Sequence, residues 1–209
     1  MIGSFFPVWG GENARISAAQ LRGIGLSRIV VAVDPAGGES AVGDETGIIA
    51  AARDSDGRLY LLDDRSGNRG ADSWGRETCL LAIELRADAI VVESNYGGDM
   101  SRQVIAQAWE DLHRENKTEQ MLIPAVISVT AKHGKRLRAE PIAQLYEQGR
   151  VHHVGQWPTL EDQMVTWVAG MDSPDRMDAA VHALTELASP QHGGAGSGGY
   201  RDRRLTGRR

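Results

Sequence analysis

Short runs of apolar residues, separated by polar segments, predict the strands of this chain. Residues 28–34 (RIVVAVD) form a continuous β-branched run that ends in an acid, which is typical of a buried central strand. Residues 47–53 and 58–63 flank a turn that ends in Asp-Gly, and they predict a hairpin. Because these three segments follow one another closely, we expect an antiparallel meander. Residues 89–93 (AIVVE) and 125–129 predict two further strands.

Apolar residues recur at helical spacing between and after these strands. The predicted helices cover residues 74–86, 99–114, 139–148, 160–169 and 174–188. The helix that precedes the strand at 89–93 implies a parallel crossover connection. In the last helix, Ser173 is expected to cap the N-terminus and Pro174 to begin the first turn. This order of elements predicts an α/β fold.

The two ends of the chain depart from this pattern. Residues 1–26 mix apolar and polar positions and are expected to form a lead-in segment, in which Ser17 and Gln20 resemble the capping box of a short helix. Residues 189–209 begin with a stretch rich in Pro, Gly and Ser, which is typical of a flexible linker, and end in an arginine-rich tail. The predicted folded domain therefore covers residues 27–188.

Composition fits one globular domain and excludes several classes of protein. The chain has 209 residues, of which 41% are hydrophobic and 24% are charged, and this balance excludes a wholly disordered chain. No apolar stretch is long enough to span a membrane, and the N-terminus lacks the regions of a signal peptide, so we expect a cytoplasmic protein. The lone Cys79 has no cysteine partner and is expected to pack in the core.

Charge is unevenly distributed along the chain. The ten C-terminal residues contain five arginines and one aspartate, so the other 199 residues carry a net charge of −9, against −5 for the whole chain. An acidic body of this kind repels nucleic acid on average. If the protein acts on DNA, it needs a local basic cluster, and its excess carboxylates need a positive counterpart such as metal ions.

Two acids, Asp34 and Glu93, stand at the C-terminal ends of separate predicted strands. In an open α/β sheet, ligands bind at this edge. If the two strands are parallel neighbours, the carboxylates lie side by side, and either one takes up a proton or a divalent cation neutralises them. Mg²⁺ and Mn²⁺ prefer such oxygen ligands. A single acid at a strand end is usually a solvated cap, but the pair predicts a metal site.

The last predicted helix supplies two more acids, which are three residues apart and therefore on the same side. Asp175 lies in the first turn, where the helix dipole alone accounts for an acid. Asp178 adjoins the predicted buried face, where an unpaired carboxylate is costly. Asp178 is therefore expected to have a partner, and a metal ion is a suitable one.

Five separated segments together resemble the C-terminal nuclease domain of the large terminase subunit of tailed bacteriophages. They span residues 28–187 and read VVAVDPAGG, GDETGI, IVVESNYGGDM, AKHGKRLRAEPIAQLYEQGRVHHVG and SPDRMDAAVHALTEL. The resemblance implies a ribonuclease H-like α/β fold. It further implies a mixed sheet of five or more strands in the order 3-2-1-4-5, with helices on both faces.

The same resemblance implies a metal-dependent nuclease site. The catalytic and metal-binding residues would be Asp34, Glu93 and Asp178. Asp44 matches a further acid that ligates metal directly or through water, and a second ligand from the last helix would have to be Asp175. Two Mg²⁺ or Mn²⁺ ions, roughly 3.5 to 4 Å apart, would then straddle the scissile phosphate, one activating the attacking water and the other stabilising the leaving oxygen.

The densest basic cluster of the domain follows the strand at 125–129. It comprises Lys132, His133, Lys135, Arg136 and Arg138. A basic run is usually a solvated face, but this one follows the strand expected beside the acidic site. We therefore expect it to bind DNA phosphates without reading bases.

The resemblance, together with the acidic cluster, implies an endonuclease that cuts concatemeric double-stranded viral DNA during genome packaging in the host cytoplasm. The chain has no G-x-x-x-x-G-K-[ST] loop and is not expected to hydrolyse ATP. The resemblance implies a terminase ATPase motor, a small terminase subunit and a portal as partners, and no membrane. Two alternatives stay open: another ribonuclease H-like nuclease such as a junction resolvase, and a non-catalytic domain that docks DNA or the portal.

Overall fold

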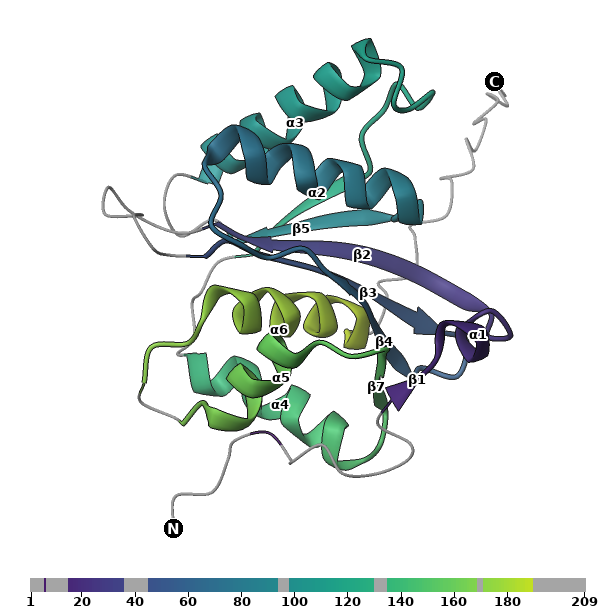
Figure 1. The fold of residues 1–209 in the computed structure, drawn as a ribbon, viewed down its shortest axis with the longest axis vertical. Coiled ribbons are helices and arrows are strands. Elements are labelled where there is room, and N and C mark those ends of the chain that lie inside the picture. The colour runs from purple at the N-terminus through teal and green to yellow at the C-terminus, as the bar shows by residue number, and fades with distance from the viewer. Residues whose placement is uncertain are drawn as a thin grey trace, which may run out of the picture.

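A mixed sheet lies between two layers of helices, with α2 and α3 on one face and α4, α5 and α6 on the other (Figure 1). The computed structural model describes residues 6, 15–35, 45–93, 98–129, 135–168 and 171–189. The strands are β1 (Arg15–Ile16), β2 (Leu26–Asp34), β3 (Gly47–Asp54), β4 (Leu59–Asp64), β5 (Ala89–Glu93), β6 (Ala125–Val129) and β7 (Val151–Val154). The helices are α1 (Ala18–Leu21), α2 (Ala71–Leu85), α3 (Gly98–Arg114), α4 (Lys135–Glu147), α5 (Pro158–Thr166) and α6 (Asp175–Ala188).

The order of the strands within the described residues is β1-β7-β4-β3-β2-β5-β6. β2, β3 and β4 form the antiparallel meander, while β5 pairs in parallel with β2, and β6 with β5. The five predicted strands thus have the order 3-2-1-4-5, and the predicted α/β fold is confirmed. β7 and β1 extend the sheet beyond β4, and the sequence predicts neither, because β7 is the short polar run VHHV and β1 has two residues.

The central strand β2 is buried on both faces. Val30 and Ala32 pack in the core cluster beside α6, while Val31 and Val33 pack in the cluster beside α2 and α3. Side chains alternate across a strand, so a strand covered on both faces must be apolar at successive positions. The continuous apolar run that predicts β2 is therefore a direct consequence of the two helical layers.

The five predicted long helices correspond to α2 to α6, with differences at their ends. The largest is at α4, which begins at Lys135 rather than at residue 139. The predicted cap of the last helix is wrong: α6 begins at Asp175, and Pro174 occupies the N-cap position. The Ser173 hydroxyl instead donates a hydrogen bond to the carboxylate of Asp178.

The N-terminal segment joins the sheet through β1 and α1. Ser17 and Gln20 form the predicted capping box of α1, with both of its hydrogen bonds present. β1 pairs in parallel with β7 at the edge of the sheet. Phe6 is fully buried and meets the ring of Tyr146 edge-on. Cys79 is fully buried, as predicted, and none of the helices in the described ranges is long and apolar enough to cross a membrane.

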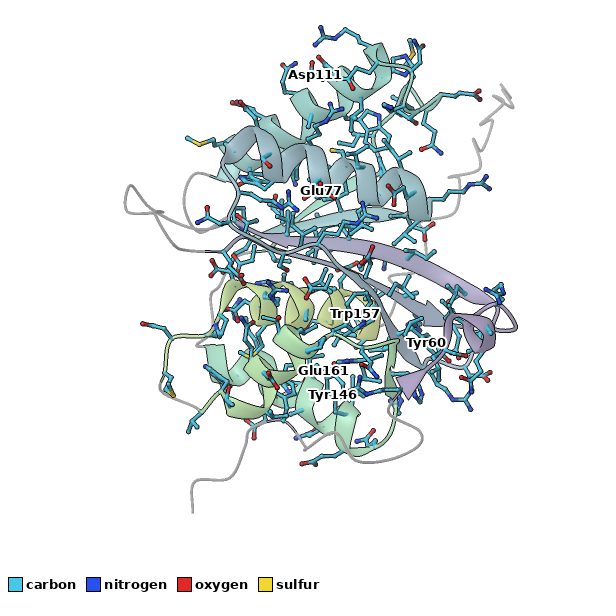
Figure 2. The ribbon with its side chains drawn as sticks, in the orientation of Figure 1. Tyr60, Glu77, Asp111, Tyr146, Trp157 and Glu161 are labelled. Carbon is cyan, nitrogen blue, oxygen red and sulfur yellow. The ribbon has the colours of Figure 1, made fainter. Side chains whose placement is uncertain are left out.

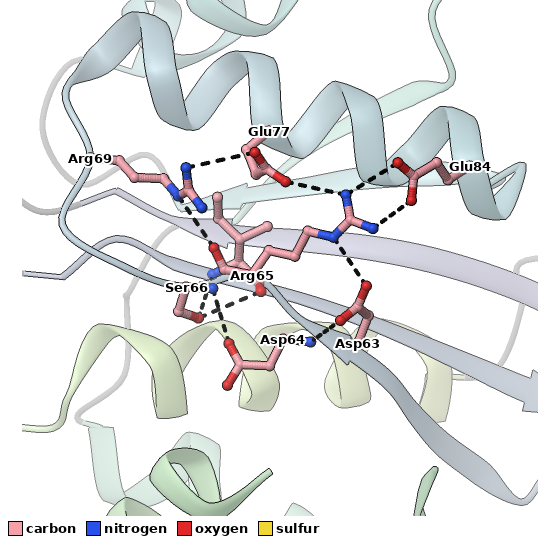
Figure 3. Close-up of polar contacts among 8 residues, drawn as sticks. Asp63, Asp64, Arg65, Ser66, Arg69, Glu77 and Glu84 are labelled. Carbon is pink, nitrogen blue, oxygen red and sulfur yellow. Dashed lines mark hydrogen bonds and ion pairs between the residues drawn. The ribbon is translucent and has the colours of Figure 1, made fainter. Parts of the chain in front are cut away.

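A network of ion pairs fastens the end of β4 to α2 (Figure 3). The Arg65 guanidinium is 3.1 Å from the Asp63 carboxylate and 3.2 Å from that of Glu77. It also pairs with Glu84, and Arg69 pairs with Glu77. These side chains are partly exposed, so each pair stabilises the fold by no more than about 1 kcal/mol. The network fixes the start of the crossover that leads through α2 to β5.

Candidate functional site

Two acids meet at one edge of the sheet because β2 and β5 are parallel neighbours. Asp34 is the last residue of β2 and Glu93 the last residue of β5, and each is only 7% exposed. Their side chains hydrogen-bond to each other. The structure therefore places side by side the two carboxylates that end the apolar strands in the sequence.

Helix α6 reaches this edge because a glycine lets it approach the sheet. Gly47 is the strand partner of Asp34 in β3. A Cβ atom at Gly47 would lie 2.1 Å from the carbonyl oxygen of Asp175 and 2.9 Å from the Cβ of Ala179. No residue with a side chain fits there without moving the helix. The absence of a side chain at Gly47 thus sets how close the first turn of α6 comes to Asp34.

Ion pairs and a hydrogen bond hold that first turn in place. Arg176 lies 2.7 Å from the carboxylate of Asp64 at the end of β4 and 2.9 Å from that of Glu45. Asp178, which is 5% exposed, accepts the hydrogen bond from Ser173. The turn that carries the helical acids is therefore fixed against both the sheet and the segment before the helix.

Both helical acids lie near enough to Asp34 to act on it electrostatically. Their negative charges contribute to raising the pKa of Asp34. Asp178 is buried and Asp175 is half-buried. The three acids Asp34, Glu93 and Asp178, which are distant in the sequence, thus gather at one place.

Sequence reasoning missed His182, which belongs to the same site. Its Nε2 lies 3.2 Å from Oε2 of Glu93, and ligand atoms of Asp34, Glu93 and His182 all lie within 4.8 Å of one another. The available signal was the spacing: His182 follows Asp178 by four residues, so both lie on one face of α6. A histidine one turn beyond a candidate ligand points to the same site.

Arg138 is directed at the acids. Its Nη1 lies 3.0 Å from Nε2 of His182 and 3.5 Å from Oε1 of Glu93. Its side chain is only 15% exposed, and its Nε has no hydrogen-bond partner among the described residues. The sequence predicts Arg138 as part of a DNA-binding cluster, whereas the structure pairs it with a carboxylate of the site.

The structure describes only some of the other predicted site residues. Those outside the described residues are Asp44, Lys132 and His133. Lys135 and Arg136 lie in the first turn of α4, and their side chains are not described. Because α4 follows β6, which runs parallel to β5, the start of α4 lies toward the edge that carries Glu93.

The electrostatics of the acid pair favour one shared proton. Burial, first of all, raises the pKa of Asp34 far above its ordinary value, and the hydrogen bond with Glu93 and the charges of the neighbouring acids act in the same direction. Burial also opposes the charged form of Glu93, but the hydrogen bonds with His182 and Asp34 and the charge of Arg138 together lower its pKa. At neutral pH the pair therefore holds one proton between its two carboxyl groups.

This donor set fits a divalent cation. Two buried carboxylates that share a proton can both ionise when a cation takes the place of that proton. Carboxylate oxygens are the ligands that Mg²⁺ and Mn²⁺ take in proteins, and imidazole is a further metal ligand. Asp34, Glu93 and His182 could hold such an ion, with Asp178 and Asp175 next to it.

The two histidines of β7 lie outside the site. His153 is fully buried, with Nδ1 2.9 Å from Glu161 and Nε2 3.0 Å from the hydroxyl of Tyr146, and Figure 2 shows these two partners in the helical layer of α4 and α5. The ring of His152 stacks on Tyr60. Both histidines pack β7 against its neighbours.

Comparison with known proteins identifies the family. A family model described as the terminase RNaseH-like domain matches residues 31–187. Among solved structures, the nuclease domain of the large terminase subunit gp2 of bacterial virus Sf6 has a TM-score of 0.59 and 13% identity, over 87% of this chain and 98% of that one. The human cytomegalovirus terminase nuclease domain has a TM-score of 0.60 and 13% identity, over 84% of this chain and 90% of that one.

At these identities the structural likeness establishes the fold, while the family match rests on the sequence. A search of curated proteins finds none that matches. The family model covers most of the chain, from the middle of β2 to the end of α6, and so includes every strand end and helix that builds the acidic site. The chain belongs to the terminase ribonuclease H-like domain family.

Proposed function

We propose that this chain is a metal-dependent endonuclease that cuts concatemeric double-stranded viral DNA during genome packaging in the host cytoplasm. The observation that carries the proposal is the meeting of two buried carboxylates, Asp34 and Glu93, at neighbouring strand ends. Such a pair is costly unless a cation compensates it, and the first turn of α6 adds two further acids. A fold built for stability alone gains nothing from this arrangement.

The residues of the chain have separate tasks in this proposal. Asp34 and Glu93 would hold a Mg²⁺ or Mn²⁺ ion in place of their shared proton, and Asp178 and Asp175 would provide carboxylates for a second ion. When bound, the ions supply Lewis-acid chemistry to the phosphodiester. Arg138 would offset the charge of Glu93 while the site holds no ion.

Phosphates are proposed to contact the basic segment at the start of α4. Its residues are Lys132, His133, Lys135 and Arg136. These contacts would hold the duplex in register without reading its sequence, and they would make binding strongly dependent on salt. Family membership supports the terminase ATPase motor, the small terminase subunit and the portal as partners of this domain.

Cleavage of plasmid DNA in the presence of Mg²⁺ or Mn²⁺ tests the proposal. Asp34→Asn, Glu93→Gln and Asp178→Asn keep the shape of each side chain and remove its charge. Each is expected to lower the cleavage rate at least about 100-fold, because a carboxylate ligand is lost. The matched control is Asp56→Asn, whose side chain is 69% exposed in the turn between β3 and β4 and should leave cleavage unchanged.

Three outcomes would contradict the proposal in different ways. If the three site variants cut like the wild type, these acids are not the active site. A strong preference for branched over linear duplex would favour a junction resolvase. DNA binding without metal binding, as measured by calorimetry, would favour a non-catalytic docking domain.

A further inference from the structure

His182 brings a nitrogen donor into a site otherwise built from carboxylates. Its ring is 6% exposed, and its Nε2 faces Oε2 of Glu93 at 3.2 Å. The helix face that presents His182 also presents Asp178, one turn earlier. The position of the ring is therefore set by the same docking of α6 that delivers the helical acid.

We infer that His182 ligates the metal ion together with Asp34 and Glu93, and that its imidazole shifts the preference of the site from Mg²⁺ toward Mn²⁺. This inference rests on the proposed metal-dependent function. Ligand atoms of the three side chains lie within 4.8 Å of one another. Two atoms bound to one ion at about 2.1 Å lie at most about 4.2 Å apart, so small side-chain movements bring all three to a common ion.

The chemistry of the donors gives the direction of the preference. Mg²⁺ takes oxygen ligands and gives up its water reluctantly, so an imidazole in place of an oxygen ligand weakens its binding. Mn²⁺ shares with Mg²⁺ the affinity for carboxylates, but as a first-row transition ion it accepts an imidazole nitrogen more readily than Mg²⁺ does, although less readily than Fe²⁺ or Zn²⁺. A site with one nitrogen and two carboxylate ligands therefore favours Mn²⁺ over Mg²⁺ by more than a purely carboxylate site does.

A positive group already faces the atoms that the ion would contact. Arg138 places Nη1 3.0 Å from Nε2 of His182 and 3.5 Å from Oε1 of Glu93. Since a guanidinium stays charged, it must withdraw when an ion binds to Nε2. Its Nε has no hydrogen-bond partner among the described residues and so does not oppose that movement. The Arg138 guanidinium thus occupies the position beside His182 and Glu93 that we assign to the metal ion.

Pulsed electron paramagnetic resonance of bound Mn²⁺ tests the inference directly, because it detects coupling to a ligand nitrogen. The wild type is measured with ordinary histidine and with ¹⁵N-labelled histidine, and His182→Ala and His182→Asn are measured alongside. Calorimetry gives the Kd of Mn²⁺ and of Mg²⁺ for each protein. The matched control is His152→Ala, since His152 lies on β7, separated from β2 by β4 and β3.

Wild-type protein with Mn²⁺ is expected to show a histidine nitrogen coupling that changes with the label, disappears in both His182 variants and persists in His152→Ala. In the His182 variants the Kd of Mn²⁺ is expected to rise at least about tenfold, and that of Mg²⁺ by less than about threefold. Bound Mn²⁺ without histidine coupling in the wild type overturns the inference and leaves the proposed function intact. Equal losses for the two ions overturn the stated preference. If the wild type binds neither ion, the proposed function and the inference fall together.

Because the labelled wild type is informative by itself, a variant that fails to fold does not prevent the test.

Discussion

Gly47 is the residue that lets α6 bring its acids to the sheet, and Gly47→Ala tests this dependence. The added Cβ would lie 2.1 Å from the carbonyl oxygen of Asp175, 2.5 Å from its carbonyl carbon and 2.9 Å from the Cβ of Ala179. The glycine lies in β3 with an extended backbone, so alanine adds no backbone strain. The substitution therefore perturbs only the spacing between β3 and α6.

The size of the effect follows from these distances. Because heavy atoms in contact lie at least about 3.0 Å from a Cβ, the start of α6 must move by about 1 Å. An overpacked contact of this kind lowers the free energy of unfolding by about 1 to 3 kcal/mol. A displacement of about 1 Å in the catalytic residues lowers the rate by about 100-fold. The loss of cleavage is thus expected to exceed what the loss of stability explains.

Urea unfolding followed by tryptophan fluorescence, Mn²⁺ calorimetry and plasmid cleavage measure the three consequences. Gly25→Ala is the control, since a Cβ at Gly25 meets nothing within 4 Å. Gly47→Ala is expected to unfold at lower urea concentration, bind Mn²⁺ more weakly and cut DNA more slowly, while Gly25→Ala matches the wild type. Wild-type stability and metal affinity in Gly47→Ala would show that this contact does not set the position of α6.

Three further predictions follow from the buried charges. Folding raises the pKa of Asp34 from 3.8, so the contribution of Asp34 to stability falls as the pH rises above that value. In EDTA, Asp34→Asn is therefore expected to be more stable than the wild type at pH 7 by about 1 to 3 kcal/mol and equally stable below pH 3.8. Urea unfolding at several pH values measures this difference. Mn²⁺ binding at pH 7 is expected to release about one proton from Asp34 and Glu93, so the binding enthalpy should vary with the ionisation enthalpy of the buffer. A binding enthalpy that is the same in every buffer would show that no proton is released. Glu161→Gln is expected to lower the free energy of unfolding by about 1 to 3 kcal/mol, because this buried carboxylate accepts hydrogen bonds from His153 and Arg15, and to leave the cleavage rate unchanged.

The fold could be predicted from the sequence where burial forces a simple pattern. β2 and β5 are covered on both faces, so their residues must be apolar in succession, and the acids that end them stand out. β7 carries no such signal, because His153 is satisfied inside the fold by Tyr146 and Glu161 rather than being apolar. A buried polar network of this kind depends on residues that are distant in the sequence, and local patterns do not reveal it.

The acidic site could be predicted in part for the same reason. The helix before β5 implies a parallel crossover, and the resemblance to terminase nuclease domains implies the strand order, so Asp34 and Glu93 could be expected side by side. The spacing of four residues places His182 on the same face of α6 as Asp178, but the rotation that turns this face toward Glu93 depends on the packing of the whole helix. The direction of Arg138 depends on where α4 docks, and a run of basic residues does not distinguish a side chain that meets DNA from one that meets a carboxylate.

The arrangement also accounts for how an acidic protein can act on DNA. The acids of the site are buried at one edge of the sheet, and Arg138 and His182 lie against Glu93 within it. A divalent ion carries more positive charge than the shared proton that it would replace, so ion binding would make this edge more positive as well as reactive. The start of the α4 backbone, which carries Lys135 and Arg136, lies toward the same edge. The negative charge of the rest of the domain would then discourage DNA from binding elsewhere, and the edge proposed to cut DNA would also be the edge that attracts it.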